Sequence, residues 1–303
     1  MTAAQVNGIT IEYEAVGDGP ALLLVMGLSA QLIHWPDEFV ARIVDRGFRV
    51  IRFDNRDIGL STKMPGEPPT PKRIMGGVLS KRLAKSEYLL ADMADDAAAL
   101  LDHLGVTRSH VVGASMGGMI AQSLAIGHPS LVASLTSIMS NTGDRRHGRT
   151  SFRLVRQMPK YLKTDPELRL ENSLAIGRII SGPSFDEERE RDLIERGFER
   201  DSDPAGTARQ TMAISASPDR TKALHKLNVP ALVIHGLADP LVLPSGGIAT
   251  ARAIPNSRLL MFPDMGHNLP RQRWDEVIDA ITTNALRATG IEAPQAKVID
   301  HSL

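Results

Sequence analysis

The chain of 303 residues contains no cysteine. This absence excludes thiolate nucleophiles, disulfide bonds and every metal site built on cysteine ligands. Neither sign of charge is in excess, because 35 Lys and Arg residues balance 35 Asp and Glu residues. A protein that neutralises nucleic-acid phosphates needs a basic surplus. The even balance therefore argues against a dedicated nucleic-acid-binding protein.

Long apolar runs and targeting signals are also missing. Apolar runs such as residues 21–26 are far too short to span a bilayer. Residues 1–6 show neither the charged region nor the apolar region of a signal peptide. We therefore expect a cytoplasmic protein with no transmembrane segment. The patterns G-x-x-x-x-G-K-[ST], G-x-G-x-x-G and H-E-x-x-H do not occur either, so we expect no nucleotide, metal or other cofactor.

The sequence does contain a regular alternation of strand-like and helix-like segments. Continuous apolar runs over residues 21–25 and 109–113 are typical of strands that are covered on both faces of a sheet. Residues 89–104 place leucines on one face of a helix that ends at Gly105. Because parallel strands need crossover connections, the alternation predicts an α/β fold with a doubly wound, mostly parallel sheet.

The alternation stops over residues 143–225, which contain helical stretches and no convincing strand. It resumes at about residue 230. We interpret this middle region as a helical cap inserted between two parts of one core, residues 1–142 and 226–290. The tail at residues 291–303 is expected to be loosely ordered.

The G-x-S-x-G motif at residues 113–117 carries the main chemical signal. It follows a buried strand and precedes a helix, so Ser115 occupies the sharp strand-to-helix turn that is typical of a serine nucleophile. The Met116 amide at the start of that helix points to where an oxyanion would form. A purely structural Gly-Ser-Gly turn is the alternative, which this context disfavours.

A serine hydroxyl needs a base, and chain order selects one among nine histidines. His267 follows the last expected strand and completes the order Ser, Asp, His. Asp239 follows the strand at 231–235 and is the predicted acid that orients His267. Asp264 is its rival, but it lies so close to His267 in the chain that it would more easily cap a local turn. The remaining histidines are less favoured: His34, His103, His110, His128, His147, His225, His235 and His301.

A second oxyanion donor is expected in the loop after the strand at residues 21–25. Gly27 permits a turn there, and the Leu28 amide would donate to the oxyanion together with Met116. A strand that ends in glycine is commonplace, so this assignment depends on position alone.

Several segments together resemble the α/β-hydrolase family: residues 25–28, 35–39, 51–61, 113–118, 236–239 and 266–267. The chain is most similar to bacterial carboxylesterases of the aclacinomycin-methylesterase type and to a mycobacterial lipase/esterase group. The resemblance covers roughly residues 5–140 and 225–290. It implies a serine esterase or lipase with a helical cap, and scaffold roles for Asp54 and Arg56. Two residues depart from the family pattern: Met26 replaces a histidine and Asp57 replaces a glycine.

The function expected from these residues is ester hydrolysis through an acyl-enzyme at Ser115, on a small-molecule or lipid ester. A thioesterase, a lactonase, a carbon–carbon bond hydrolase or a cofactor-free perhydrolase would use the same Ser-His-Asp set and would differ in the cap. A non-catalytic ligand-binding protein of the same fold is a further alternative, against which the intact set argues.

Basic residues gather in two segments, residues 72–85 and 145–163. In the second, Phe152 and Val155 alternate with arginines at helical spacing. One interpretation is that both segments attract an anionic acyl substrate or make peripheral contact with a lipid surface. The interpretation we favour from sequence is a solvated face, balanced by acidic stretches at 92–102 and 186–203. The sequence leaves open whether the chain forms a homodimer.

Overall fold

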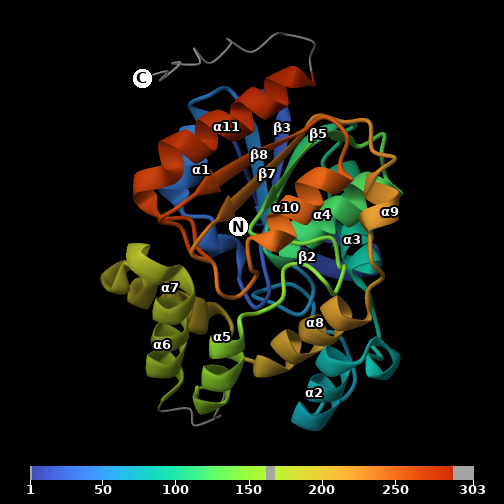
Figure 1. Cartoon of the computed structure of the whole chain (residues 1–303). Coiled ribbons are helices and arrows are strands. Elements are labelled where there is room, and N and C mark those ends of the chain that lie inside the picture. Colours follow the sequence, from blue (N-terminus) through green and yellow to red (C-terminus); the bar gives the residue numbers. More distant parts are fainter. Residues whose placement is uncertain (1, 162–167, 289–303) are drawn as a thin grey trace, which may run out of the picture.

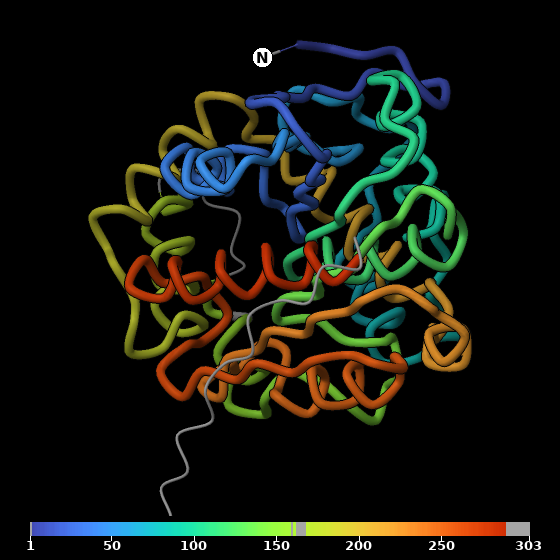
Figure 2. Tube along the Cα trace, turned by 90° about the horizontal axis from the view of Figure 1, so that it is seen from above, coloured from blue at the N-terminus to red at the C-terminus, as the bar shows by residue number. Residues whose placement is uncertain are grey.

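The computed structural model describes residues 2–161 and 168–288, so the predicted tail lies outside the described residues. The strands form one sheet in the order β1-β2-β4-β3-β5-β6-β7-β8. The first two pairs in this order, β1 with β2 and β2 with β4, are antiparallel, and all later pairs are parallel. Seen from above, the N-terminal strands lie at one end of the molecule and the orange segments near the C-terminus at the other (Figure 2). The strands are β1 (Thr2–Val6), β2 (Ile9–Val16), β3 (Ala21–Val25), β4 (Arg49–Phe53), β5 (Ser109–Ala114), β6 (Val132–Ile138), β7 (Ala231–Gly236) and β8 (Ser257–Phe262).

Helices cover both faces of this sheet (Figure 1). On one face lie α1 (Asp37–Val44) and α11 (Trp274–Arg287), and on the other lie α3 (Leu90–His103), α4 (Met116–Gly127) and α10 (Ser245–Ala253). This arrangement confirms the predicted doubly wound α/β fold.

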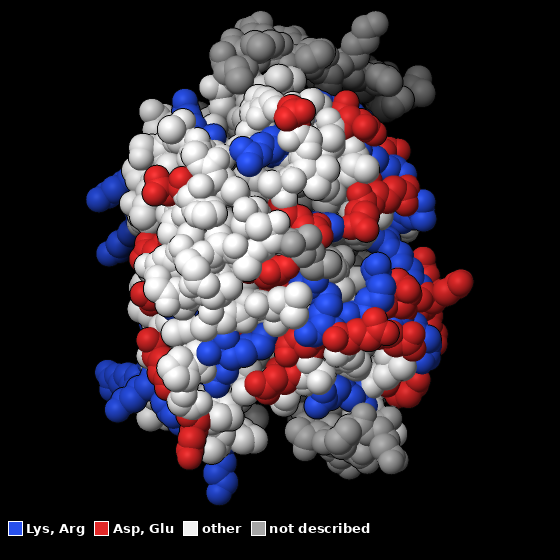
Figure 3. Space-filling model, turned by 180° about the vertical axis from the view of Figure 1, so that it is seen from behind, with Lys and Arg blue, Asp and Glu red and all other residues white. Residues whose placement is uncertain are grey.

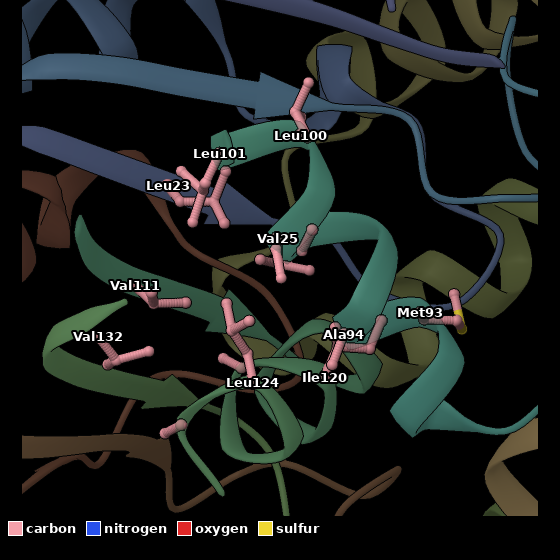
Figure 4. Packing of buried hydrophobic residues seen from close by; sticks show 14 of the residues in the cluster. Leu23, Val25, Met93, Ala94, Leu100, Leu101, Val111, Ile120, Leu124 and Val132 are labelled. Carbon is pink, nitrogen blue, oxygen red and sulfur yellow. The ribbon is translucent and has the colours of Figure 1, made fainter. Parts of the chain in front are cut away.

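The β3 strand shows why a strand in the middle of this sheet has apolar residues at consecutive positions. All five of its residues are buried. Leu22 and Leu24 pack against α1 and α11, whereas Leu23 and Val25 pack against α3 and α4 (Figure 4). Since successive side chains point to opposite faces, a strand with helices on both sides needs apolar residues at every position.

Between β6 and β7 the described part of the chain contains helices and no strand: α5 (Phe152–Gln157), α6 (Arg169–Ser181), α7 (Glu187–Arg200), α8 (Pro204–Ala216) and α9 (Thr221–Leu224). A further helix, α2 (Pro71–Leu79), precedes α3 and packs against α8. Single 3-10 turns complete the structure at η1 (Leu32–His34), η2 (Lys81–Leu83), η3 (Met158–Lys160), η5 (Gly182–Ser184) and η6 (Arg271–Arg273). The division into core and cap at residues 143 and 225 stays a prediction. No helix in the described ranges is both long and apolar enough to cross a membrane.

Candidate active site

Ser115 occupies the tight turn between β5 and α4. Its backbone has φ +56° and ψ −120°, a conformation that costs energy for a residue with a side chain. The neighbouring glycines make the turn sterically feasible, because a Cβ atom at Gly113 would lie 2.1 Å from the Gly117 carbonyl oxygen. The Ser115 amide donates to the Ile138 carbonyl of β6 at 2.9 Å, which fixes the turn to the sheet.

The structure brings Ser115, His267 and Asp239 together although they come from three different loops. The His267 Nε2 atom lies 2.9 Å from the Ser115 Oγ atom, and its Nδ1 atom lies 2.7 Å from Asp239 Oδ2. All three loops follow parallel strands and therefore meet at the C-terminal edge of the sheet. The Asp239 side chain is fully buried and that of His267 is only 8% exposed. Water therefore has little access to the carboxylate of Asp239.

The surroundings of Asp239 keep it ionised. Its Oδ1 atom accepts hydrogen bonds from the Leu241 and Val242 amides, both at 2.9 Å. Burial of the carboxyl acts to raise its pKa, but hydrogen bonds from His235 and His267, the charge of His267 and the Val242 amide outweigh burial, so the pKa falls to about 2. Asp239 is therefore a carboxylate at neutral pH.

His235, which the sequence analysis disfavoured as a base, lies buried behind Asp239. Its Nε2 atom is 2.7 Å from the Val242 carbonyl oxygen and 3.4 Å from Asp239 Oδ2. It thereby holds the loop that carries Asp239. The rival acid, Asp264, is engaged elsewhere, because both of its oxygens accept from the Arg273 guanidinium at 3.0–3.3 Å.

The loop that carries Leu28 lies directly beside Ser115. A Cβ atom at Gly27 would be 3.0 Å from the Ser115 Cβ atom. Within the described residues, neither the Leu28 amide nor the Met116 amide donates to another protein group. Met116 opens α4, so its free N–H stands at a helix N-terminus, where a negative charge is stabilised.

A glutamine from α8 fixes this loop, and the sequence analysis missed it. The Oε1 atom of Gln210 accepts from the Ser29 amide at 3.1 Å, and its Nε2 atom donates to the Arg56 carbonyl at 2.9 Å. The same loop is also held by Asn55, whose Nδ2 atom donates to the Met26 carbonyl at 3.0 Å. Gln210 lies 181 positions from Ser29, and no motif marks it, so no local signal could have identified it.

The departure at Asp57 has a structural explanation. Its backbone adopts φ +73°, the left-handed region that favours glycine, which accounts for the glycine that is usual at this position. The buried Asp57 carboxylate accepts from Arg209 of α8 at 2.9 Å, from the Tyr88 hydroxyl at 2.6 Å and from the Met64 amide at 2.8 Å. These contacts offset the strain and fasten α8 to the sheet.

Taken together, the three side chains can activate a hydroxyl, and the two free amides can receive a negative oxygen. This is the arrangement needed for acyl transfer by a serine nucleophile. Within residues 2–161 and 168–288, no group of three or more His, Asp and Glu residues could hold a metal ion.

Comparisons with known proteins find similarity along most of the chain. A family model described as the alpha/beta hydrolase fold matches residues 20–270. Rhodomycin D methylesterase DnrP from Streptomyces peucetius is 29% identical, over 93% of this chain and 96% of its own length. The putative non-heme bromoperoxidase BpoC from Mycobacterium tuberculosis is 27% identical, over 86% and 91%. A solved structure of a thermophilic esterase from Thermogutta terrifontis superposes with a TM-score of 0.71 at 24% identity, covering 95% of this chain and 98% of that one. At that identity the match shows the fold alone.

Proposed function

The chain belongs to the α/β-hydrolase fold family, and we propose that it is a serine hydrolase that cleaves carboxylic esters. The observation that carries the proposal is the unbroken line of hydrogen bonds from Ser115 through His267 to Asp239, at 2.9 and 2.7 Å. Its geometry is that of a nucleophile, a general base and an orienting acid.

In the proposed reaction, His267 Nε2 takes the hydroxyl proton as Ser115 Oγ attacks the ester carbonyl. The Asp239 carboxylate accepts from Nδ1, which selects the required tautomer and stabilises the imidazolium. His267 then gives its proton to the leaving alcohol, which departs and leaves an acyl group on Ser115. A water molecule then gives a proton to His267 and attacks the acyl carbonyl. The carboxylic acid is released as Ser115 Oγ takes the proton back from His267.

The amides of Leu28 and Met116 are proposed to stabilise the oxyanion of both tetrahedral intermediates. Two observations support this role: both N–H groups lack a protein partner within the described ranges, and Gly27 lies against Ser115. Removal of one such donor typically costs about 100- to 1000-fold in rate.

We further propose that the substrate is an ester of a small alcohol. The support is the similarity to a methylesterase over nearly the whole length of both chains. Location in the cytoplasm stays a prediction, and whether the chain forms a homodimer stays open.

A series of p-nitrophenyl esters from acetate to palmitate, together with methyl esters of aromatic acids, tests the proposal. We expect hydrolysis by the wild type and none above background by Ser115→Ala. A fluorophosphonate probe should add its mass to the wild type at Ser115 and leave the variant unmodified. A folded wild type that neither hydrolyses any of these esters nor reacts with the probe would refute the proposal.

A second candidate, a cofactor-free perhydrolase, uses the same residues. The similarity to a putative non-heme bromoperoxidase supports this candidate. In that reaction hydrogen peroxide replaces water as the attacker of the acyl-enzyme, and a peracid is released. Bromination of monochlorodimedone that requires acetate, peroxide and Ser115 would favour this candidate, provided that its rate exceeds that of ester hydrolysis.

A further inference from the structure

Two neighbouring surface segments, residues 72–85 and 145–156, expose apolar side chains; we call them together the basic face. Single exposed apolar residues are ordinary, but a cluster marks a surface with a partner. Half of the large hydrophobic side chains that are exposed in the described residues lie here, with exposed fractions from 49% to 75%: Met75, Val78, Leu79, Leu83, Phe152 and Val155.

The basic face also concentrates positive charge in a chain that is neutral overall. Each segment contains five Lys or Arg residues and no Asp or Glu. The two segments lie at the end of the molecule that carries α5, α8 and α2 (Figure 1). They touch directly, because the Arg145 guanidinium donates to the Val78 carbonyl.

Several acids of the stretches that could have balanced this charge pair with other residues, and none of them forms an ion pair with the basic face in the described part of the chain. In 92–102, Asp96 pairs with Arg56 and Asp95 with His128. In 186–203 three acids pair with basic residues outside the basic face: Glu187 with Arg178 and Arg191, Asp192 with Arg196, and Asp201 with Lys63. Figure 3 shows the result from behind, with red and blue side chains intermixed on the right, over α7. Of the ten Lys and Arg residues of the basic face, Arg146 is the one that forms an ion pair among the described residues, and its partner is Asp144, which directly precedes the second segment.

We propose that the basic face docks on an anionic lipid surface. Exposed aliphatic side chains enter the headgroup region while neighbouring Lys and Arg side chains meet lipid phosphates, which is the combination that such a surface selects. This inference goes beyond the proposed function and does not depend on Ser115.

Other partners fit the basic face less well. A symmetric contact with a second copy would place the same patch against itself and bring like charges together. A nucleic acid would neutralise the charge but would leave the aliphatic side chains in water, and Phe152 is the one aromatic residue in the two segments that could stack on a base.

The position of the basic face also suits delivery of a substrate from a lipid surface. A surface hollow between α5, α6 and the loop after β7 is lined by Arg153, Leu154, Ile179, Gly182 and Ala238, among others. Ala238 directly precedes Asp239 in the chain. The basic face therefore borders the loop that carries the acid of the site.

Vesicle flotation of the full chain tests the proposal. The protein carries Ser115→Ala so that no lipid is turned over, and the vesicles contain phosphatidylcholine with or without phosphatidylglycerol. We expect at least about tenfold tighter binding to the anionic vesicles. This preference should disappear in about 1 M salt, where the screening length falls to about 3 Å.

A matched pair of double variants localises the contact. Arg82→Glu with Leu83→Ser should weaken binding about tenfold or more, because it reverses one charge and removes one apolar anchor. Arg258→Glu with Leu259→Ser makes the same chemical change at exposed positions of β8 and should leave binding unchanged.

Three results would overturn the proposal. The first is binding that does not distinguish anionic from neutral vesicles, and the second is an equal loss in both double variants. The third is a combination of two findings: the protein with the native basic face does not bind vesicles, and analytical ultracentrifugation shows that it is a dimer that dissociates in Arg82→Glu with Leu83→Ser. The basic face would then be the contact with a second copy of the chain. Hydrolysis of soluble esters by the chain with Ser115 restored is measured separately, so failure here does not affect the proposed function.

Discussion

The polar groups of two regions have different surroundings: those near Ser115 are buried and bonded to other protein groups, whereas those of the basic face are exposed to water. At the site, Asp239 and His267 are almost fully buried and their polar atoms bond to one another and to neighbouring amides. On the basic face, charged and apolar side chains both stand in water. A reaction between atoms about 3 Å apart needs buried side chains in fixed positions. Binding to a lipid surface needs charged and apolar side chains that are exposed. The two regions should therefore respond to different perturbations.

Loss of the nucleophile should have the largest effect and should separate the two regions completely. Ser115→Ala is expected to lower kcat/KM for soluble esters by about 10⁴- to 10⁶-fold, because no attacking oxygen remains. Vesicle binding and the thermal unfolding midpoint should match the wild type. Turnover of the variant within tenfold of the wild type would contradict the assignment of Ser115.

Replacement of the orienting acid should have the next largest effect. Asp239→Asn is expected to reduce kcat by about 10⁴-fold, because an amide can donate to Nδ1 and so stabilise the wrong tautomer of His267. The matched control is Asp264→Asn, which removes the rival carboxylate from its ion pair with Arg273 and should change kcat less than twofold. A reversal of the two results would make Asp264 the acid.

A fall in pH should destabilise the sheet, whereas high salt should weaken the proposed contact of the basic face with lipid. Burial among β-strands and the charge of Arg108 lower the pKa of His110 to about 4. Between that value and its ordinary value of about 6.5, the unfolded chain binds the proton more readily, so stability declines as pH falls. This group should cost about 2 kcal/mol between pH 7 and pH 5.

Urea unfolding of the wild type and of His110→Gln at the two pH values isolates this contribution. The variant should lose less stability between them by about 2 kcal/mol, whatever its absolute stability. An equal loss in both proteins would show that His110 is protonated as readily when folded as when unfolded.

The smallest effect is expected from the glutamine that ties α8 to the loop beside Ser115. Gln210→Leu removes its hydrogen bonds to Ser29 and Arg56, which should let the Leu28 amide drift from the oxyanion. We expect kcat to fall about tenfold with KM nearly unchanged, since the lost contact matters in the transition state. Ser215→Ala on the same helix removes a hydroxyl that donates to the Thr211 carbonyl of α8, and it should have no effect. A raised KM at constant kcat would assign Gln210 to substrate binding instead.

The sequence by itself determined the elements of the sheet and the turn at Ser115. The strand expected at residues 21–25 has the bounds that the structure gives β3, and the helix expected at residues 89–104 differs from α3 by one residue at each end. Such features depend on the period of apolar residues and on glycines at a tight turn, both of which are written within a few consecutive residues.

Only the tertiary structure decided which distant groups meet. Chain order predicts Asp239 beside His267, but it does not predict the ion pair of Asp264 with Arg273 or the hydrogen bond between Gln210 and Ser29, which lie 181 positions apart. The tertiary structure also showed that Glu187, Asp192 and Asp201 pair with residues outside the basic face. Contacts of this kind depend on how whole helices pack on one another. Periodicity indicates that a helix has an apolar face, but the partner for each polar side chain is fixed only once the helices are in place.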